Sequence, residues 1–165
     1  DMSIVVAKVF DNRIEFAADS QISGHYVIFP DQGYQKLRRI NDIVLGFSGN
    51  VEECNYMTYY MKTHLPEGND ELDVIRYLVE FAKFKKELCG DATLRSQYLI
   101  AYGGKLFEAD GLSVIEIKDF AAIGCGRDFG YAALYLCHSV REAVEVAIKL
   151  DPYVGGDITE YTIAR

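Results

Sequence analysis

Residues that could take part in chemistry stand at or next to the ends of the strands and helices that the sequence predicts. These residues are Asp19, Lys36, Gly49, Cys125 and Asp151. A carboxylate such as Asp19 and an ammonium such as Lys36 favour each other's charged forms when they lie close together. From these two residues alone, an ordinary ion pair at a strand edge is the simpler explanation. Their interpretation therefore depends on the pattern around them.

The four cysteines give no sign of a metal site or a disulfide framework. Cys54, Cys89, Cys125 and Cys137 show no Cys-x-x-Cys spacing. Isolated cysteines of this kind are typical of reduced thiols in a cytosolic protein. We therefore expect a cytoplasmic protein with no metal ion and no cofactor.

Composition and charge limit the classes of partner. The 165 residues include 17 Lys or Arg and 25 Asp or Glu, which gives a formal net charge of -8 and argues against nucleic-acid binding. No apolar run reaches the length of a membrane span, and no leader with a charged start and an apolar centre indicates secretion. We therefore expect one soluble domain over residues 1–165.

The apolar pattern predicts strands and helices in alternating groups. Strands are expected over 3–9, 13–18, 35–39, 43–47, 97–102, 105–109, 113–117, 120–123 and 157–163, and helices over 51–64, 70–88, 128–138 and 141–150. Asn50 is expected to cap the first helix and Gly90 to end the second. Two sheets covered by pairs of helices would bury both sets of apolar strands in one layered α+β domain.

Five short motifs occur in an order that resembles a known family. They are Ala17-Ala18-Asp19-Ser20, Lys36-Leu37-Arg38-Arg39-Ile40, Leu45-Gly46-Phe47-Ser48-Gly49, Ala122-Ile123-Gly124-Cys125-Gly126 and Asp151-Pro152-Tyr153-Val154-Gly155-Gly156-Asp157-Ile158. The series resembles the β-type subunits of the proteasome and the bacterial HslV peptidase, which are N-terminal-nucleophile hydrolases. It covers nearly the whole chain. The resemblance implies a four-layer αββα sandwich.

The resemblance also implies a mechanism and assigns residues to it. In the family, the hydroxyl of the first residue attacks a peptide carbonyl, and the free α-amine of that residue is the base. An α-amine titrates at about 7.7–8.0, so it can accept a proton at cellular pH. Lys36 and Asp19 match the lysine and aspartate that support this chemistry, and Gly49 matches the glycine whose N–H helps form the oxyanion hole.

Further positions carry over from the same motifs. Ser23 matches a residue whose backbone pairs with an extended substrate. Ile22, Phe47 and Val51 would flank the first specificity pocket and favour apolar or aromatic side chains, although core packing explains the same residues equally well.

The nucleophile has two candidate positions. The spacing from nucleophile to aspartate in the family is sixteen residues, which matches Ser3 to Asp19. Matching the letters of Ile4-Val5 instead would put Met2 at the nucleophile position and make the chain inactive. We prefer Ser3, which would be exposed if Met2 is an initiator methionine that is removed and Asp1 is a remnant of cloning. If Asp1 is native, a preceding segment must be removed instead.

Two supporting positions depart from the family. Cys125 and Val154 replace serines, whereas Asp151 is retained. A thiol is a weaker hydrogen-bond partner than a hydroxyl, and valine offers no hydrogen bond. Cys125 itself is a poor candidate nucleophile because no motif places a histidine beside it.

We expect a peptidase that assembles with itself into stacked rings and hydrolyses unfolded protein or peptides, with an ATP-dependent unfoldase as a possible partner. The alternative is a non-catalytic structural ring subunit like the α-type members of the family. Those members carry an extra N-terminal helix, whereas this chain starts with a strand. An amidase acting on a small molecule is a third reading, which the short chain and its glycine motifs disfavour.

Overall fold

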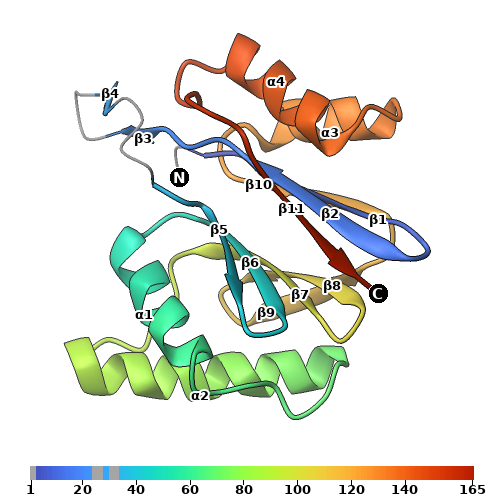
Figure 1. Ribbon diagram of the computed structural model, residues 1–165. Helices are drawn as coiled ribbons and strands as arrows, with labels where there is room; N and C mark the ends of the chain where they lie inside the picture. Colours follow the sequence, from blue (N-terminus) through green and yellow to red (C-terminus); the bar gives the residue numbers. More distant parts are fainter. Residues whose placement is uncertain (1–2, 24–27, 30–33) are drawn as a thin grey trace.

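The computed structural model describes residues 3–23, 28–29 and 34–165. Two antiparallel sheets form the centre of the molecule, and a pair of helices covers the outer face of each (Figure 1). In order along the chain, the elements are β1 Val5–Val9, β2 Arg13–Ala18, β3 Ile22–Ser23, β4 Ile28–Phe29, β5 Leu37–Ile40, β6 Ile43–Ser48, α1 Val51–Met61, α2 Glu71–Cys89, β7 Gln97–Tyr102, β8 Lys105–Asp110, β9 Ser113–Ile117, β10 Phe120–Ile123, α3 Arg127–Tyr135, α4 Val140–Leu150 and β11 Thr159–Ala164.

The first sheet brings the two ends of the described chain together. Its strand order is β10-β1-β2-β11, with antiparallel pairing throughout. β1 therefore lies in the interior of the sheet, and the last strand borders β2. This order places the residues just before β1, just after β2 and just before β11 at one end of the sheet.

The second sheet has the order β5-β6-β7-β8-β9, in which each strand pairs with the next along the chain. Successive side chains of β6 face opposite sides. Ile43, Leu45 and Phe47 pack toward α1 and α2, whereas Val44 packs toward the first sheet. Because both faces are covered, all of β6 is buried.

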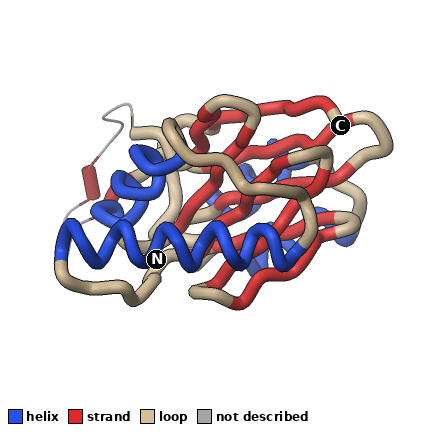
Figure 2. The backbone as a smooth tube through the Cα atoms, turned by 90° about the horizontal axis from the view of Figure 1, so that it is seen from below, coloured by secondary structure: helices blue, strands red, loops and turns tan. Residues whose placement is uncertain are grey.

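Three apolar clusters hold the four layers together. One lies between α3–α4 and the first sheet, one between the two sheets, and one between the second sheet and α1–α2. Seen from below, α1 and α2 cross in front of the strands of the second sheet (Figure 2). The expected α+β sandwich of αββα type is confirmed.

The helix boundaries follow from their caps. Asn50 accepts a hydrogen bond from the Glu53 N–H, as predicted. Asp70 forms a capping box with Asp73 at the start of α2, and Gly90 ends that helix in the left-handed conformation at φ 79°. Within the described residues, no helix is both long and apolar enough to cross a membrane.

Candidate active site

The carboxylate of Asp19 connects three segments that are far apart in the sequence. Asp19 directly follows β2 and is completely buried. Its Oδ1 accepts hydrogen bonds from the Ile4 N–H at 3.1 Å and from the Lys36 ammonium at 2.8 Å. Its Oδ2 accepts from the Gly155 N–H at 3.1 Å. A buried carboxylate needs such partners to stay charged, and here it fixes the start of β1 in position.

Lys36 is the positively charged residue among the hydrogen-bond donors to Asp19. It directly precedes β5, and its backbone carbonyl accepts a hydrogen bond from the Phe47 N–H at 3.2 Å. Burial lowers the pKa of Lys36, whereas Asp19 and, more weakly, Cys125 act to raise it; the net direction is downward. The predicted pairing of Lys36 with Asp19 is confirmed. The role of the pair in catalysis stays a prediction.

Ser3 is held by the turn between β10 and α3. The Ser3 side chain is buried, and its carbonyl accepts hydrogen bonds from the Gly126 N–H at 3.1 Å and from the Cys125 thiol at 3.6 Å. Gly124 has φ +97°, and a Cβ atom added there would lie 2.2 Å from the Ser3 oxygen. The turn therefore requires glycine both for its conformation and for the close approach of Ser3. Residues 1–2, including the alternative position Met2, lie outside the described residues.

Cys125 belongs to the same group but is poorly suited to attack a carbonyl. Burial raises the pKa of its thiol, the hydrogen bond to the Ser3 backbone lowers it, and the hydrogen bond with Asp151 raises it; the net direction is upward. A thiol with a raised pKa stays protonated at neutral pH and is a weak nucleophile. Cys125 therefore supports Ser3, and Asp151 in turn contacts Cys125.

Val154 has the surroundings of a core residue. Its side chain is buried in the apolar cluster under α3 and α4. Its N–H donates to the Asp151 carbonyl at 3.3 Å, and the next residue, Gly155, donates to Asp19. Val154 thus anchors the loop that delivers the Gly155 N–H, a donor that no sequence motif predicted.

Gly49 lies beside this group at the junction of β6 and α1. Gly124 lies close to both Ser3 and Ser48. A Cβ atom added to Gly124 would meet the backbone oxygen of Ser3 and, at 3.2 Å, the hydroxyl of Ser48, which precedes Gly49. Gly49 has φ +125°, a conformation that other residues rarely adopt. Among residues 3–23, 28–29 and 34–165, its N–H has no hydrogen-bond acceptor. A free backbone N–H here could stabilise an oxyanion.

The predicted specificity residues differ in their surroundings. The Phe47 side chain is buried in the cluster against α1, whereas Val51 is exposed at the first turn of that helix and Ile22 is half-buried in β3. Ser23 lies in β3, where its backbone pairs with Ile28; nothing further is described for its side chain. The two-residue strands β3 and β4 were not predicted.

The group contains one buried ammonium, two carboxylates, one protonated thiol and a serine hydroxyl. This combination suits acyl transfer to a hydroxyl nucleophile, because the ammonium favours deprotonation of groups near it. Among the parts of the chain that are described, no three His, Cys, Asp or Glu side chains gather as metal ligands.

Comparison with known proteins identifies the fold. No family model matches the chain, and no curated protein matches its sequence. Similar solved structures include Thiobacillus denitrificans BPH in complex with epoxomicin, with a TM-score of 0.84, 18% identity and coverage of 98% of both chains. Eukaryotic HslV from Trypanosoma brucei has a TM-score of 0.75 and 21% identity, covering 98% of this chain and 99% of the other.

A third similar structure is Anbu (ancestral beta-subunit) from Yersinia bercovieri. It has a TM-score of 0.75 and 15% identity, covering 98% of this chain and 81% of the other. The chain therefore has the HslV-like, proteasome β-type fold of the N-terminal-nucleophile hydrolases. The resemblance drawn from the five motifs is confirmed at the level of the fold.

Proposed function

We propose that this chain is a subunit of a proteasome-like peptidase, with the Ser3 hydroxyl as nucleophile and the freed Ser3 α-amine as base. The observation that carries the proposal is the Asp19 carboxylate, which joins the Lys36 ammonium to the Ile4 N–H next to Ser3. The likeness to BPH and HslV supports the same assignment.

In the proposed reaction, the Ser3 oxygen bonds to the carbonyl carbon of the substrate while the hydroxyl proton passes to the α-amine, directly or through a water molecule. The positive charge of Lys36 disfavours protonation of that amine before the attack and stabilises negative charge at the Ser3 oxygen. Asp19 holds the Lys36 ammonium in place, and Cys125 and Gly126 hold the Ser3 carbonyl.

The negative charge that develops on the substrate oxygen would be stabilised by the Gly49 N–H. The intermediate collapses when the leaving amine takes the proton from the Ser3 ammonium, which leaves an ester on the Ser3 oxygen. A water molecule then attacks the ester carbonyl with the same α-amine as base. This step releases the second product and restores the hydroxyl.

We further propose that the subunits form stacked homo-oligomeric rings in the cytoplasm and receive unfolded protein or peptides, with an ATP-dependent unfoldase as partner. In this proposal, subunits contact one another through the helix layers, and the α3–α4 layer carries four exposed apolar side chains at its two ends. They are Tyr135, Leu136, Leu150 and Tyr153.

The competing proposal is a non-catalytic structural ring subunit. The apolar surroundings of Val154, where the family has a serine, favour it. The two functions differ in whether the α-amine of Ser3 has to be free, and this difference can be measured.

The test compares protein that begins at Ser3 with protein that retains Asp1 and Met2. An acylated α-nitrogen cannot act as the base, and losing general-base catalysis costs about 10²–10⁴-fold in rate. We expect the Ser3 form to cleave fluorogenic peptides with an apolar residue before the scissile bond, and to gain the mass of epoxomicin in intact mass spectrometry. The longer form should do neither.

Sedimentation of both forms completes the design. A Ser3 form that assembles into rings but neither cleaves peptide nor reacts with epoxomicin would establish the structural subunit. Equal activity of the two forms would exclude Ser3 as the nucleophile.

A further inference from the structure

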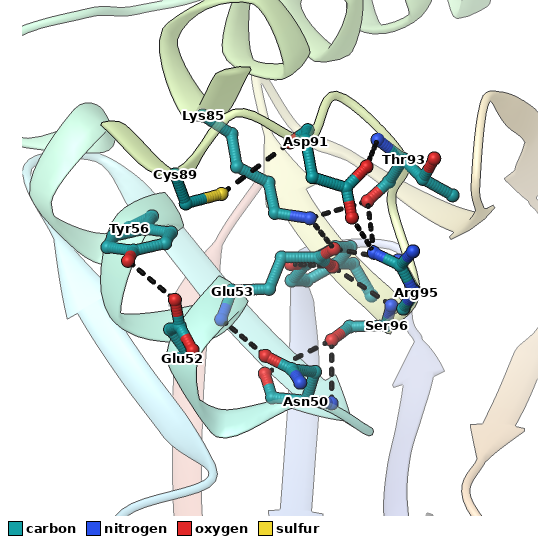
Figure 3. A network of polar contacts seen from close by, with 11 residues as sticks. Asn50, Glu52, Glu53, Tyr56, Lys85, Cys89, Asp91, Thr93, Arg95 and Ser96 are labelled. Atoms are coloured by element: carbon teal, nitrogen blue, oxygen red, sulfur yellow. Dashed lines mark hydrogen bonds and ion pairs between the residues drawn. The ribbon is translucent and has the colours of Figure 1, made fainter. Parts of the chain in front are cut away.

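A buried carboxylate on α1 lies outside the group around Ser3. Glu53 is 1% exposed, and four donors surround its carboxylate (Figure 3). Its Oε1 accepts from the Arg95 N–H at 2.7 Å and from the Lys85 ammonium at 3.3 Å. Its Oε2 accepts from the Ser96 N–H at 2.9 Å and from the Tyr98 hydroxyl at 2.7 Å. Such complete pairing of a buried anion fixes the segment that supplies the donors.

That segment is the loop between α2 and β7, and it is also held from α2. The Lys85 ammonium donates to the Thr93 carbonyl at 2.5 Å in addition to contacting Glu53. Arg95 forms an ion pair with Asp91 within the loop. The backbone of residues 95–96 is thus held from α1, from α2 and by the loop's own ion pair.

The far side of this backbone contacts Gly49. An added Cβ atom on Gly49 would lie 3.0 Å from the Ser96 Cα and 3.3 Å from the Arg95 oxygen. The buried Ser96 hydroxyl accepts a hydrogen bond from the backbone N–H of Asn50 at 2.9 Å and donates one to the backbone carbonyl of Asn50 at 3.3 Å. Figure 3 shows Ser96 between Glu53 and Asn50.

Gly49 needs such support because glycine has no side chain to restrict its backbone. An oxyanion donor is effective only when it is held in position before the reaction. The Ser96 hydroxyl accepts the hydrogen bond of the Asn50 N–H, whereas the neighbouring Gly49 N–H has no acceptor among the described residues.

We propose that Glu53 and Ser96 are positioning residues for the Gly49 N–H: the Glu53 carboxylate fixes the backbone of residues 95–96, and the Ser96 hydroxyl fixes the peptide that follows Gly49. The proposal rests on the proposed function, in which Gly49 stabilises the oxyanion. Neither residue touches the substrate.

The test introduces Ser96→Ala and Glu53→Gln into protein that begins at Ser3. Ser96→Ala removes the acceptor for the Asn50 N–H, and Glu53→Gln leaves only one amide oxygen for four donors. Tyr77→Phe is the control, because it removes a hydrogen bond of 2.8 Å to the His64 carbonyl elsewhere in the same helix layer.

We expect Ser96→Ala to lower kcat about 10-fold to 10²-fold with KM within twofold, since deleting an oxyanion donor outright costs about 10²–10³-fold. Affinity for a peptide aldehyde, whose adduct with Ser3 places an oxygen at the oxyanion position, should fall in parallel. Affinity for the matching peptide alcohol should not change. Glu53→Gln should act in the same direction if it folds, and Tyr77→Phe should change none of these values.

Hydrogen exchange of residues 49–51 gives a second readout that needs no activity. We expect faster exchange in Ser96→Ala and unchanged exchange in Tyr77→Phe. Unchanged exchange, or an unchanged kcat in an active enzyme, would overturn the positioning role. If the unsubstituted Ser3 form neither turns over substrate nor binds the aldehyde, the proposed function fails. The part of the inference that concerns the oxyanion then fails with it. Hydrogen exchange still decides whether Ser96 orders the segment around Gly49.

Discussion

The Lys36 ammonium and the Ile4 N–H share one oxygen atom of Asp19, at 2.8 Å and 3.1 Å. The side chains of Lys36 and Asp19 are only 4% and 0% exposed. Because the Ile4 nitrogen is the other end of the peptide unit that carries the Ser3 carbonyl, any change at Lys36 is transmitted to the backbone of Ser3.

Lys36→Ala should therefore remove both activity and stability. We expect kcat/KM to fall at least 10²-fold. Removing one partner of a buried ion pair costs about 3–5 kcal/mol in the free energy of unfolding. Lys83→Ala is the control, because the pair of Lys83 with Glu80 is exposed and exposed pairs contribute about 0–1 kcal/mol. Urea unfolding and peptide cleavage measure the two effects, and equal losses in both variants would contradict the assignment.

Changes at Ser3 should separate chemistry from folding. Gly126 and Cys125 hold Ser3 through hydrogen bonds to its backbone carbonyl, so neither Ser3→Ala nor Ser3→Thr removes these bonds. In protein that begins at residue 3, we expect Ser3→Ala to abolish peptide cleavage and Ser3→Thr to retain it, with melting temperatures close to that of the unsubstituted protein. Retained cleavage by Ser3→Ala would exclude the hydroxyl mechanism.

The raised pKa of Cys125 predicts slow alkylation of its thiol. Cys89, Cys125 and Cys137 are all exposed, so access of the reagent does not distinguish them. With iodoacetamide at pH 7, mass mapping should nevertheless find Cys89 and Cys137 modified before Cys125. Cys125→Ser should keep peptide cleavage, because a hydroxyl can also donate to the Ser3 carbonyl. A loss of activity in Cys125→Ser together with full activity in Ser3→Ala would instead identify a thiol nucleophile.

The lowered pKa of Glu53 predicts that the free energy of unfolding falls in acid. Burial alone would raise its pKa, but the hydrogen bonds from Arg95, Tyr98 and Ser96 outweigh burial, and the pKa lies below its usual 4.5. The unfolded chain therefore takes up the proton first as the pH falls. The stability that Glu53 contributes is complete above pH 4.5 and is lost as the pH falls through the folded-state pKa.

Urea unfolding of the unsubstituted protein and of Glu53→Gln should reveal this difference. At pH 7 the variant should be less stable by about 3–5 kcal/mol, since Lys85 loses its buried partner. The difference in the free energy of unfolding between the two proteins should become smaller below pH 4.5. A gap that stays constant down to pH 3 would show that Glu53 is not an ionised partner in the folded protein.

The fold was predictable wherever local pattern and local structure agree. The strands over 13–18, 97–102, 113–117 and 120–123 have the predicted bounds, because their apolar runs end at turn residues. Asn50 and Gly90 mark helix ends as predicted, since capping depends on neighbouring residues alone. The expected start of β1 at Ser3 was two residues early, because Ser3 is held by the turn at Gly124–Gly126 and does not pair as a strand residue.

The site was predictable only in part. The five motifs led to Asp19, Lys36 and Gly49, but the Glu53 network has no local signature. Glu53 resembles an ordinary acid in the first turn of a helix, and its partners Arg95 and Ser96 are 42 and 43 residues away. The Gly155 N–H is a backbone donor, which every residue except proline carries, so its identity gives no signal.

The bond from Gly155 to Asp19 spans 136 residues, and the strand that follows Gly155 completes the first sheet beside β2. A nascent chain on the ribosome therefore has Ser3, Asp19 and Lys36 long before it has Gly155 and β11. Until translation has passed residues 155–164, Asp19 lacks the Gly155 N–H donor and the edge of β2 that pairs with β11 is open. The order of synthesis thus keeps the group around Asp19 incomplete until residues 155–164 have been made.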